Sequence, residues 1–226
     1  VPTTSATKDD ANKAIDEALT KKLDDIKANT KLTDEEKAKL TNDANTAANN
    51  AKAAIDGATK DADVTTAKKT GVENINNVTV PTTSATKDDA NKAIDEALDN
   101  KKSEINNATN IDQATKDNLI QAATDAATKA KDAINNATTN NDVATEQTKG
   151  SNAIDAVKVP SLTDSQNDAK KAIDEALNNK KSEINGATNI DQPTKDQLIK
   201  EATDAATKAK NAIDQATTAD AIKKAQ

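Results

Sequence analysis

The sequence contains no aromatic residue, no Cys, no Met, no His and no Arg. Without His or Cys there is no imidazole base, no thiolate nucleophile and no zinc or haem ligand of the common kinds. Without Arg there is no bidentate clamp for phosphate or carboxylate. Because only 34% of residues are hydrophobic, the chain also has little with which to line an apolar pocket. We therefore predict no enzyme activity, no catalytic residue and no cofactor.

Two clusters of carboxylates are the only candidates for a metal site. They are "DAD" at Asp61–Asp63 and "DEE" at Asp34–Glu36. Neither has the alternating acidic pattern of a calcium-binding loop. The second cluster follows Thr33, so its acids are explained by the first turn of a helix, where negative charge is favourable. We predict no metal site.

The charge balance and the lack of long apolar runs exclude two classes of partner. The net charge is −7 and the Lys residues do not gather in a basic patch, so neither nucleic acid nor an anionic membrane surface is an expected partner. No apolar run approaches the roughly 18 residues that span a membrane. The chain begins without Met or a signal peptide, so we expect it to be a piece of a longer protein.

What the sequence does contain is a long internal repeat. The nineteen residues "VPTTSATKDDANKAIDEAL" at 1–19 return unchanged at 80–98, and Pro2, Pro81 and Pro160 lie 79 residues apart. The spacing has no insertion or deletion, and self-similarity at a fixed period indicates a repeat architecture. We predict three domains: a repeat at 1–80, a repeat at 81–159, and a repeat at 160–226 whose third helix is truncated.

Hydrophobic periodicity predicts three helices in each repeat, and therefore an all-α fold. Apolar and small residues recur at alternating steps of four and three, which is the seam of a left-handed helical bundle. In the second repeat the predicted seams are Ile94, Leu98, Lys101 and Ile105 in the first helix, Leu119, Ala123, Ala126, Ala130, Ala133 and Ala137 in the second, and Val143, Gln147, Gly150, Ile154 and Val157 in the third. We expect Lys101 to lay its stem along the seam with its ammonium in water. Gly71 and Gly150 are expected where helices approach closely.

Capping residues predict where the helices begin. Thr33 with Glu36, and Thr163 with Gln166, fit the capping box, in which a hydroxyl and a carboxylate or amide satisfy the first backbone N–H groups. Ser5 and Ser84 stand in the position of Thr163, and Asp112 and Asp191 stand in that of Thr33. The third helix should end before Val80 and Val159, because a residue that precedes proline avoids the helical region.

An odd number of antiparallel helices places the two ends of a bundle at opposite poles. We therefore expect tandem three-helix bundles joined end to end into an elongated, monomeric rod, on the order of 110–150 Å long for this chain from the helical rise. Four pairs of opposite charge at (i, i+4) spacing are expected on the solvated faces: Glu17–Lys21, Glu35–Lys39, Asp125–Lys129 and Asp204–Lys208.

The segments "AIDEAL--KKSEIN", "LTDEEK", "ATDAATKAK-AI--ATT", "DV" and "G---I--V", in this order and at this period, resemble the tandem helical repeats of the domain-of-unknown-function 1542 family. The resemblance covers essentially the whole chain, except that the third repeat lacks "G---I--V". It implies a large cell-wall-anchored surface protein of Gram-positive bacteria, in which such repeats form a stalk and some members are linked to cell aggregation or biofilm. It brings no catalytic residues. No sorting motif is present in the sequence, so the extracellular, cell-wall location is implied by resemblance only.

Three functions remain open at this point. The first is a non-catalytic stalk or spacer of a surface adhesin that projects a distal binding domain from the cell wall. The second is a three-helix module that binds a host serum or matrix protein, although the Trp, Tyr and Arg that dominate binding hot spots are absent. The third is homophilic adhesion between cells or within a biofilm.

Overall fold

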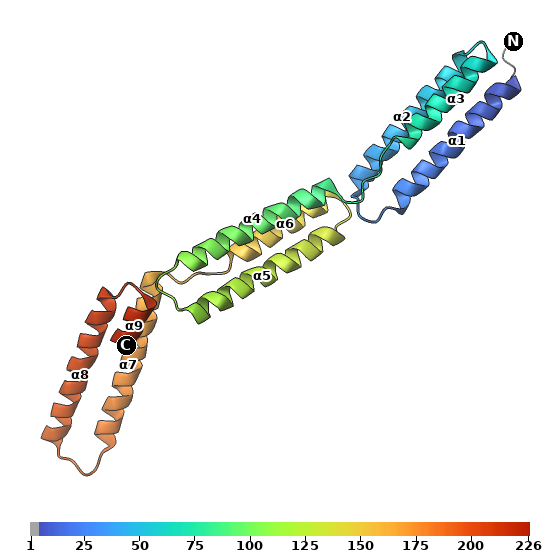
Figure 1. Cartoon of the computed structure of the whole chain (residues 1–226). Coiled ribbons are helices and arrows are strands. Elements are labelled where there is room, and N and C mark those ends of the chain that lie inside the picture. The colour runs from blue at the N-terminus through green and yellow to red at the C-terminus, as the bar shows by residue number, and fades with distance from the viewer. Residues whose placement is uncertain (1–4) are drawn as a thin grey trace. The chain divides into compact units, whose positions relative to one another are not determined.

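The computed structural model describes residues 5–226, and the regular structure within them is entirely helical (Figure 1). The helices are α1 (Ser5–Ala28), α2 (Asp34–Gly57), α3 (Asp61–Asn76), α4 (Ala85–Asn107), α5 (Gln113–Asn136), α6 (Asn140–Asp155), α7 (Leu162–Gly186), α8 (Gln192–Gln215) and α9 (Ala219–Ala225). The prediction of an all-α fold made of helical repeats is confirmed. The domain boundaries and the arrangement of the repeats into a rod stay predictions.

The chain forms two compact units. The first contains the described residues up to Ile94 together with Lys129–Gly150, and the second contains Asp95–Thr128 together with Ser151–Gln226. The division crosses α4, α5 and α6, so each unit holds part of the second repeat. The first unit holds all of α1, α2 and α3, and the second holds all of α7, α8 and α9.

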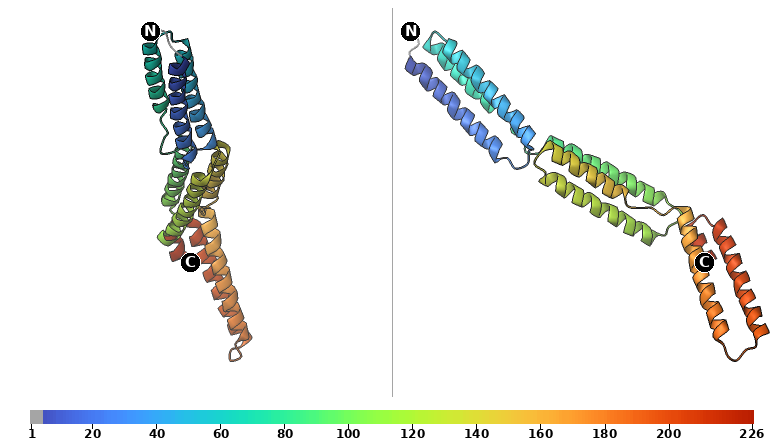
Figure 2. Two further views of the ribbon diagram at one scale, coloured as in Figure 1. Left: turned by 90° about the vertical axis from the view of Figure 1, so that its right-hand side faces the viewer. Right: turned by 180° about the vertical axis from the view of Figure 1, so that it is seen from behind.

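Helices α1, α2 and α3 alternate in direction, and they stay side by side in both views of Figure 2. Two lysines of α1 show the directions of the other helices. Lys8 Nζ donates to the carbonyl oxygen of Asp56 at 2.6 Å, so α2 ends where α1 begins. Lys22 Nζ donates to the carbonyl oxygen of Asn76 at 3.1 Å, so α3 ends where α1 ends. The chain therefore leaves this bundle at the pole opposite to its start, as the odd helix number predicts.

One isoleucine from each helix forms the centre of the first repeat. Ile15, Ile55 and Ile75 are completely buried in the first repeat, and Ile94, Ile134 and Ile154 are completely buried in the second. In the third repeat Ile213 is completely buried, whereas its neighbour Ile173 is only partly buried against the cluster. Since α9 has seven residues where α3 and α6 have sixteen, this core has less of a third helix to cover it.

In the second helix of a repeat, some of the buried residues lie one position away from the residues predicted on the seam. The buried residues of α2 are Ala44, Ala48, Ala51 and Ile55, and those of α5 are Ala123, Ala127, Ala130 and Ile134. Ala54, the first-repeat equivalent of Ala133 on the predicted seam, is exposed. The isoleucine takes the centre because its larger side chain gains more from burial than alanine does.

The two mid-helix glycines lie at close helix–helix contacts, which confirms their predicted role. A Cβ atom at Gly71 would lie well inside 3.0 Å of the side chains of Ala51 and Ile15. A Cβ atom at Gly150 would meet Ala130 and Ile94 in the same way. No Gly in residues 5–226 has a positive φ, so these glycines are needed for space and not for backbone conformation.

Four predicted helix caps are confirmed, three of them at the starts of α2, α5 and α8. Thr33 and Glu36 form the reciprocal capping box at the start of α2. Asp191 accepts the Thr194 N–H at the start of α8, with Pro193 in the first turn, and Asp112 accepts the Thr115 N–H at 2.8 Å at the start of α5.

The cap predicted at Thr163 and Gln166 is wrong. The box that opens α7 is Ser161 with Asp164, two residues earlier. A carboxylate is a stronger acceptor for a backbone N–H than an amide oxygen, and starting the helix at Leu162 adds two residues to α7. Ser84 caps α4 as predicted, since its Oγ accepts the Lys87 N–H at 3.1 Å. The cap predicted at Ser5 lies outside the side chains that the structure describes.

Charged side chains from three of the four predicted pairs have other partners in the structure. Lys39 pairs with Asp43 and Asp204 with Lys200, while Asp125 accepts from Gln121 and Glu35 accepts from the backbone of Asn140. Lys101 is also not in water: it is 9% exposed, and its ammonium contacts Glu104 at 2.8 Å and the carbonyl oxygen of Asp155 at 3.3 Å. The last turn of α6 offers carbonyl groups without helical partners, and these attract a cation.

Candidate functional site: the junctions between successive repeats

The first junction is where the first repeat contacts the second. The first repeat contributes the α1–α2 loop and the first turn of α2, and the second repeat contributes two segments. The Asp34 N–H donates to the carbonyl oxygen of Thr138 at 2.9 Å. Asn29 Nδ2 donates to the carbonyl oxygen of Pro81 at 2.9 Å. The end of the first repeat is therefore held on one side by the segment before α4 and on the other by the α5–α6 loop.

Two glutamates of α2 complete the first junction. Glu35 Oε2 accepts the Asn140 N–H at 2.9 Å. Glu36 Oε1 accepts both the N–H and the hydroxyl of Thr86, each at 3.1 Å. The remaining oxygen of Glu36, Oε2, accepts the N–H of Thr33 at 2.9 Å within the capping box. One carboxylate therefore closes a helix end and binds the following repeat at the same time.

The electrostatics of Glu36 favour its charged form. Its partial burial raises the pKa, but the hydrogen bonds from the backbone of Thr33 and Thr86 and from the hydroxyls of Ser84 and Thr86 outweigh that cost and leave the pKa below the usual 4.5. A groove of about 410 Å³ lies beside this carboxylate. It is lined by Leu32, Glu36, Lys39, Leu40, Pro81, Thr83, Ala85 and Asp88.

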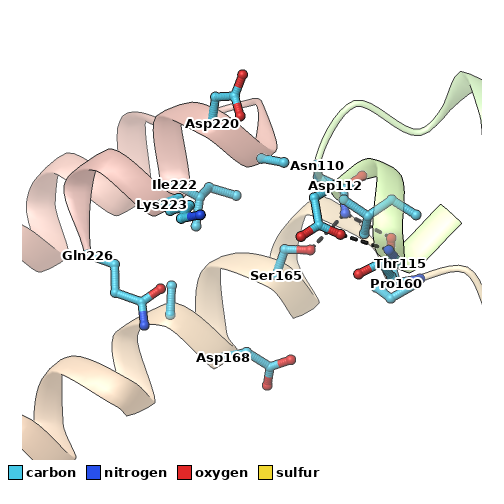
Figure 3. Close-up of a pocket in the computed structure, with 13 residues that line it drawn as sticks. Asn110, Asp112, Thr115, Pro160, Ser165, Asp168, Asp220, Ile222, Lys223 and Gln226 are labelled. Atoms are coloured by element: carbon cyan, nitrogen blue, oxygen red, sulfur yellow. Dashed lines mark hydrogen bonds between the residues drawn. The ribbon is translucent and has the colours of Figure 1, made fainter.

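The second junction joins the corresponding parts of the second and third repeats, within the second compact unit (Figure 3). The Asn110 amide donates to the carbonyl oxygen of Pro160 at 2.9 Å and to Ser165 Oγ at 2.8 Å. Thr109 accepts the Ala219 N–H at its carbonyl oxygen, at 2.9 Å. Its hydroxyl donates to the carbonyl oxygen of Thr217 at 3.3 Å.

A groove of about 560 Å³ lies at the second junction, between the start of α5, α7 and α9 (Figure 3). Part of its polar lining belongs to the junction itself, since Asn110 and Ser165 bond to each other and Asp112 caps α5. The Thr115 hydroxyl and N–H beside it, together with the Lys223 ammonium, lower the pKa of the Asp112 carboxyl. These groups serve the ends of helices and the contact between repeats.

The two junctions engage equivalent backbone groups with different chemistry. The carbonyl oxygen of Pro81 or Pro160 accepts an asparagine amide in both, but the asparagines Asn29 and Asn110 do not occupy equivalent positions in the repeat. The N–H of Asn140 meets a carboxylate, whereas the N–H of the equivalent Ala219 meets a carbonyl oxygen. The contact is thus repeated although the side chains that make it have changed.

The sequence does not reveal these junction residues. Asn29, Glu35 and Asn110 lie in the short stretch where the repeats differ most, "NTKLTDEE" against "ATNIDQAT". The available signal is that this stretch keeps almost no residue between the first two repeats, although other parts of the repeat vary as well. Thr33 and Glu36 were predicted as a cap, but their contact with the next repeat was not.

The carboxylate clusters considered for metal binding have other partners or positions in the structure. Glu35 and Glu36 belong to the first junction, and Asp61 and Asp63 lie in the first turn of α3. Within residues 5–226 no group of three or more acidic, His or Cys side chains is placed to hold a metal ion. In the same part of the chain, no helix combines the length and the apolar composition needed to cross a bilayer.

Comparison with known proteins gives one family. Residues 7–83 and 86–162 each match the family described as Domain of Unknown Function (DUF1542), in tandem. No curated protein and no solved structure matches the chain. The two matches cover more than half of the sequence and follow the 79-residue spacing, so the chain belongs to the DUF1542 family.

Proposed function

We propose that the chain is a non-catalytic spacer, a segment of the stalk of a bacterial surface adhesin that projects a distal binding domain from the cell wall. The observation that carries the proposal is the repetition, at a constant 79-residue spacing, of a helical unit whose entry and exit lie at opposite poles, as Lys8 and Lys22 place them in the first repeat. Duplicating such a unit lengthens the molecule, whereas duplicating a catalytic site adds nothing to its reach.

Two further observations support this function. The repeats are joined by hydrogen bonds at both junctions. A spacer needs such contacts so that neighbouring repeats do not fold back on one another. The side chains available for recognition are small or charged, without the aromatic residues and Arg that dominate protein-binding hot spots. The extracellular, cell-wall location belongs to the same proposal, and it rests on the resemblance carried by the sequence motifs.

Small-angle X-ray scattering tests the spacer. The full chain should have a maximum dimension on the order of 110–150 Å, and a version ending at Val159 should be shorter by about 40–50 Å, as the rise of helices of this length implies. A chain whose maximum dimension barely changes on removal of the third repeat would contradict the proposal, because the repeats would then be packed side by side.

The two other functions have their own measurements. Incubation of the immobilised chain with serum and matrix proteins should recover no tight partner, and one nanomolar partner would favour a host-binding module. Sedimentation at increasing concentration should show a monomer, and reversible association would favour homophilic adhesion.

A further inference from the structure

The two junctions differ in whether their hydrogen-bond acceptors can be protonated. At the first junction, Glu35 and Glu36 accept three of the hydrogen bonds that cross to the second repeat. At the second junction, the equivalent positions are Ala114 and Thr115. The bonds that cross there run between amides, hydroxyls and carbonyl groups.

Both oxygens of the Glu36 carboxylate accept hydrogen bonds. Its Oε2 accepts from Thr33 within α2, and its Oε1 accepts twice from Thr86 at the start of α4. Protonation converts one oxygen into a hydroxyl that donates. That hydroxyl would face the donor it had previously accepted from, so either the capping box or the contact with Thr86 is lost.

We propose that the first junction is an acid-released clasp: protonation of Glu36 frees the start of α2 from the start of α4, while the second junction stays closed. The inference concerns the stiffness of one joint and stands independently of the spacer function.

The charged groups around Glu36 come from both helices that meet there. Asp34 and Glu35 lie in its own turn of α2, Lys39 lies one turn further along, and Asp88 lies across the groove in α4. Lys39 is paired with Asp43 at 2.9 Å. Lys87, the other cation at the start of α4, donates to the carbonyl oxygen of Asn135 at 2.9 Å. The surroundings are therefore mainly acidic, and the hydrogen bonds keep the carboxylate charged.

The direction of the pH dependence follows from these bonds. Because the hydrogen bonds lower the pKa of Glu36 below 4.5 despite its partial burial, the clasp contributes fully above pH 4.5. Its contribution is lost as the pH falls through the lowered pKa of the folded state. The titratable groups near the second junction are Asp112, Asp164, Lys158 and Lys223. Asp112 and Asp164 cap their own helices, and they also attract Lys223 and Lys158 across the boundary between the repeats. Their protonation weakens the caps and these two attractions, and it leaves the Asn110 bonds in place.

Distance measurements between spin labels test the clasp. Since the chain has no Cys, pairs of introduced Cys residues label cleanly at exposed positions. Asn49→Cys with Lys92→Cys reports the first junction, and Asn118→Cys with Asn178→Cys reports the second. As the pH falls from neutral to well below 4.5, the distance distribution of the first pair should broaden. The second pair should keep its width, while circular dichroism shows that the helices persist.

A variant at neutral pH separates release of the clasp from acid unfolding. Glu36→Gln leaves one acceptor oxygen where two are used, so the first pair should already be broad at neutral pH and should respond little to acid. Glu146→Gln, which removes a carboxylate from α6, is the matched control and should keep the narrow distribution and the acid transition. The proposal is overturned if Glu36→Gln is as narrow as the control at neutral pH. Equal broadening of both label pairs, or no change in the first, overturns it as well.

Discussion

At the residue scale, the glycines divide into two that have no room for a side chain and two that have. Gly150→Ala would place a methyl group against Ala130 and Ile94. We expect it to destabilise the chain by about 1–3 kcal/mol, the usual cost of overpacking a core. Gly57→Ala is the control, because nothing lies within 4 Å of its added methyl group, and it should be neutral or stabilising by up to about 1 kcal/mol. Chemical denaturation of the two variants measures both, and similar effects would contradict the role of close packing.

Lys101 shows what sequence reasoning finds and misses at the level of one residue. Its place on the seam of α4 follows from periodicity, and the structure confirms it. The position of its ammonium does not follow, because its acceptor is the backbone at the end of α6, 54 residues away. The equivalent Lys180 is exposed and pairs with Glu183, so the same residue type in the same motif has two environments.

At the element scale, two capping boxes are possible in the sequence at the start of α7, and the structure forms the one at Ser161 and Asp164. Ser161→Ala should destabilise the third repeat by about 1 kcal/mol, since it removes the hydroxyl that accepts the Asp164 N–H at 3.0 Å. Thr163→Ala should have little effect, although Thr163 with Gln166 matches the box in sequence. Thermal unfolding followed by circular dichroism compares the two variants. A larger loss for Thr163→Ala would mean that α7 begins two residues later.

The helices themselves could be predicted because their determinants are local. Alternating steps of four and three, caps such as Thr33 and Asp191, and the prolines fix where most helices lie. The offset of the alanine seam could not be predicted so well, because several alanines of α2 and α5 fit two neighbouring stripes. Packing of Ile55 and Ile134 against the other helices selects one stripe, and that choice depends on contacts far apart in the sequence.

At the scale of the whole molecule, the junctions were beyond sequence reasoning because they join residues about 50 to 110 positions apart. Periodicity showed that the repeats are uniform, and uniformity suggested that their contacts would be uniform too. The structure instead shows carboxylates at the first junction and an asparagine amide at the second. The repeat therefore conserves which backbone groups are held, and it varies the side chains that hold them.

These contacts imply that neighbouring repeats stabilise one another. In linear arrays, stability is approximately the sum of each repeat's own stability and that of its interfaces, and a repeat whose core consists of isoleucines and alanines has little stability to spare. An excised second repeat, residues 80–159, should therefore melt at a lower temperature than the full chain, because it keeps neither Glu36 on one side nor Ser165 on the other. The full chain carrying both Glu36→Ala and Asn110→Ala should melt between the two, since it loses junction bonds but keeps every helix. Circular dichroism at matched concentration makes the comparison. If the excised repeat and the full chain melt together, the junctions contribute no stability and serve only to set the path of the chain.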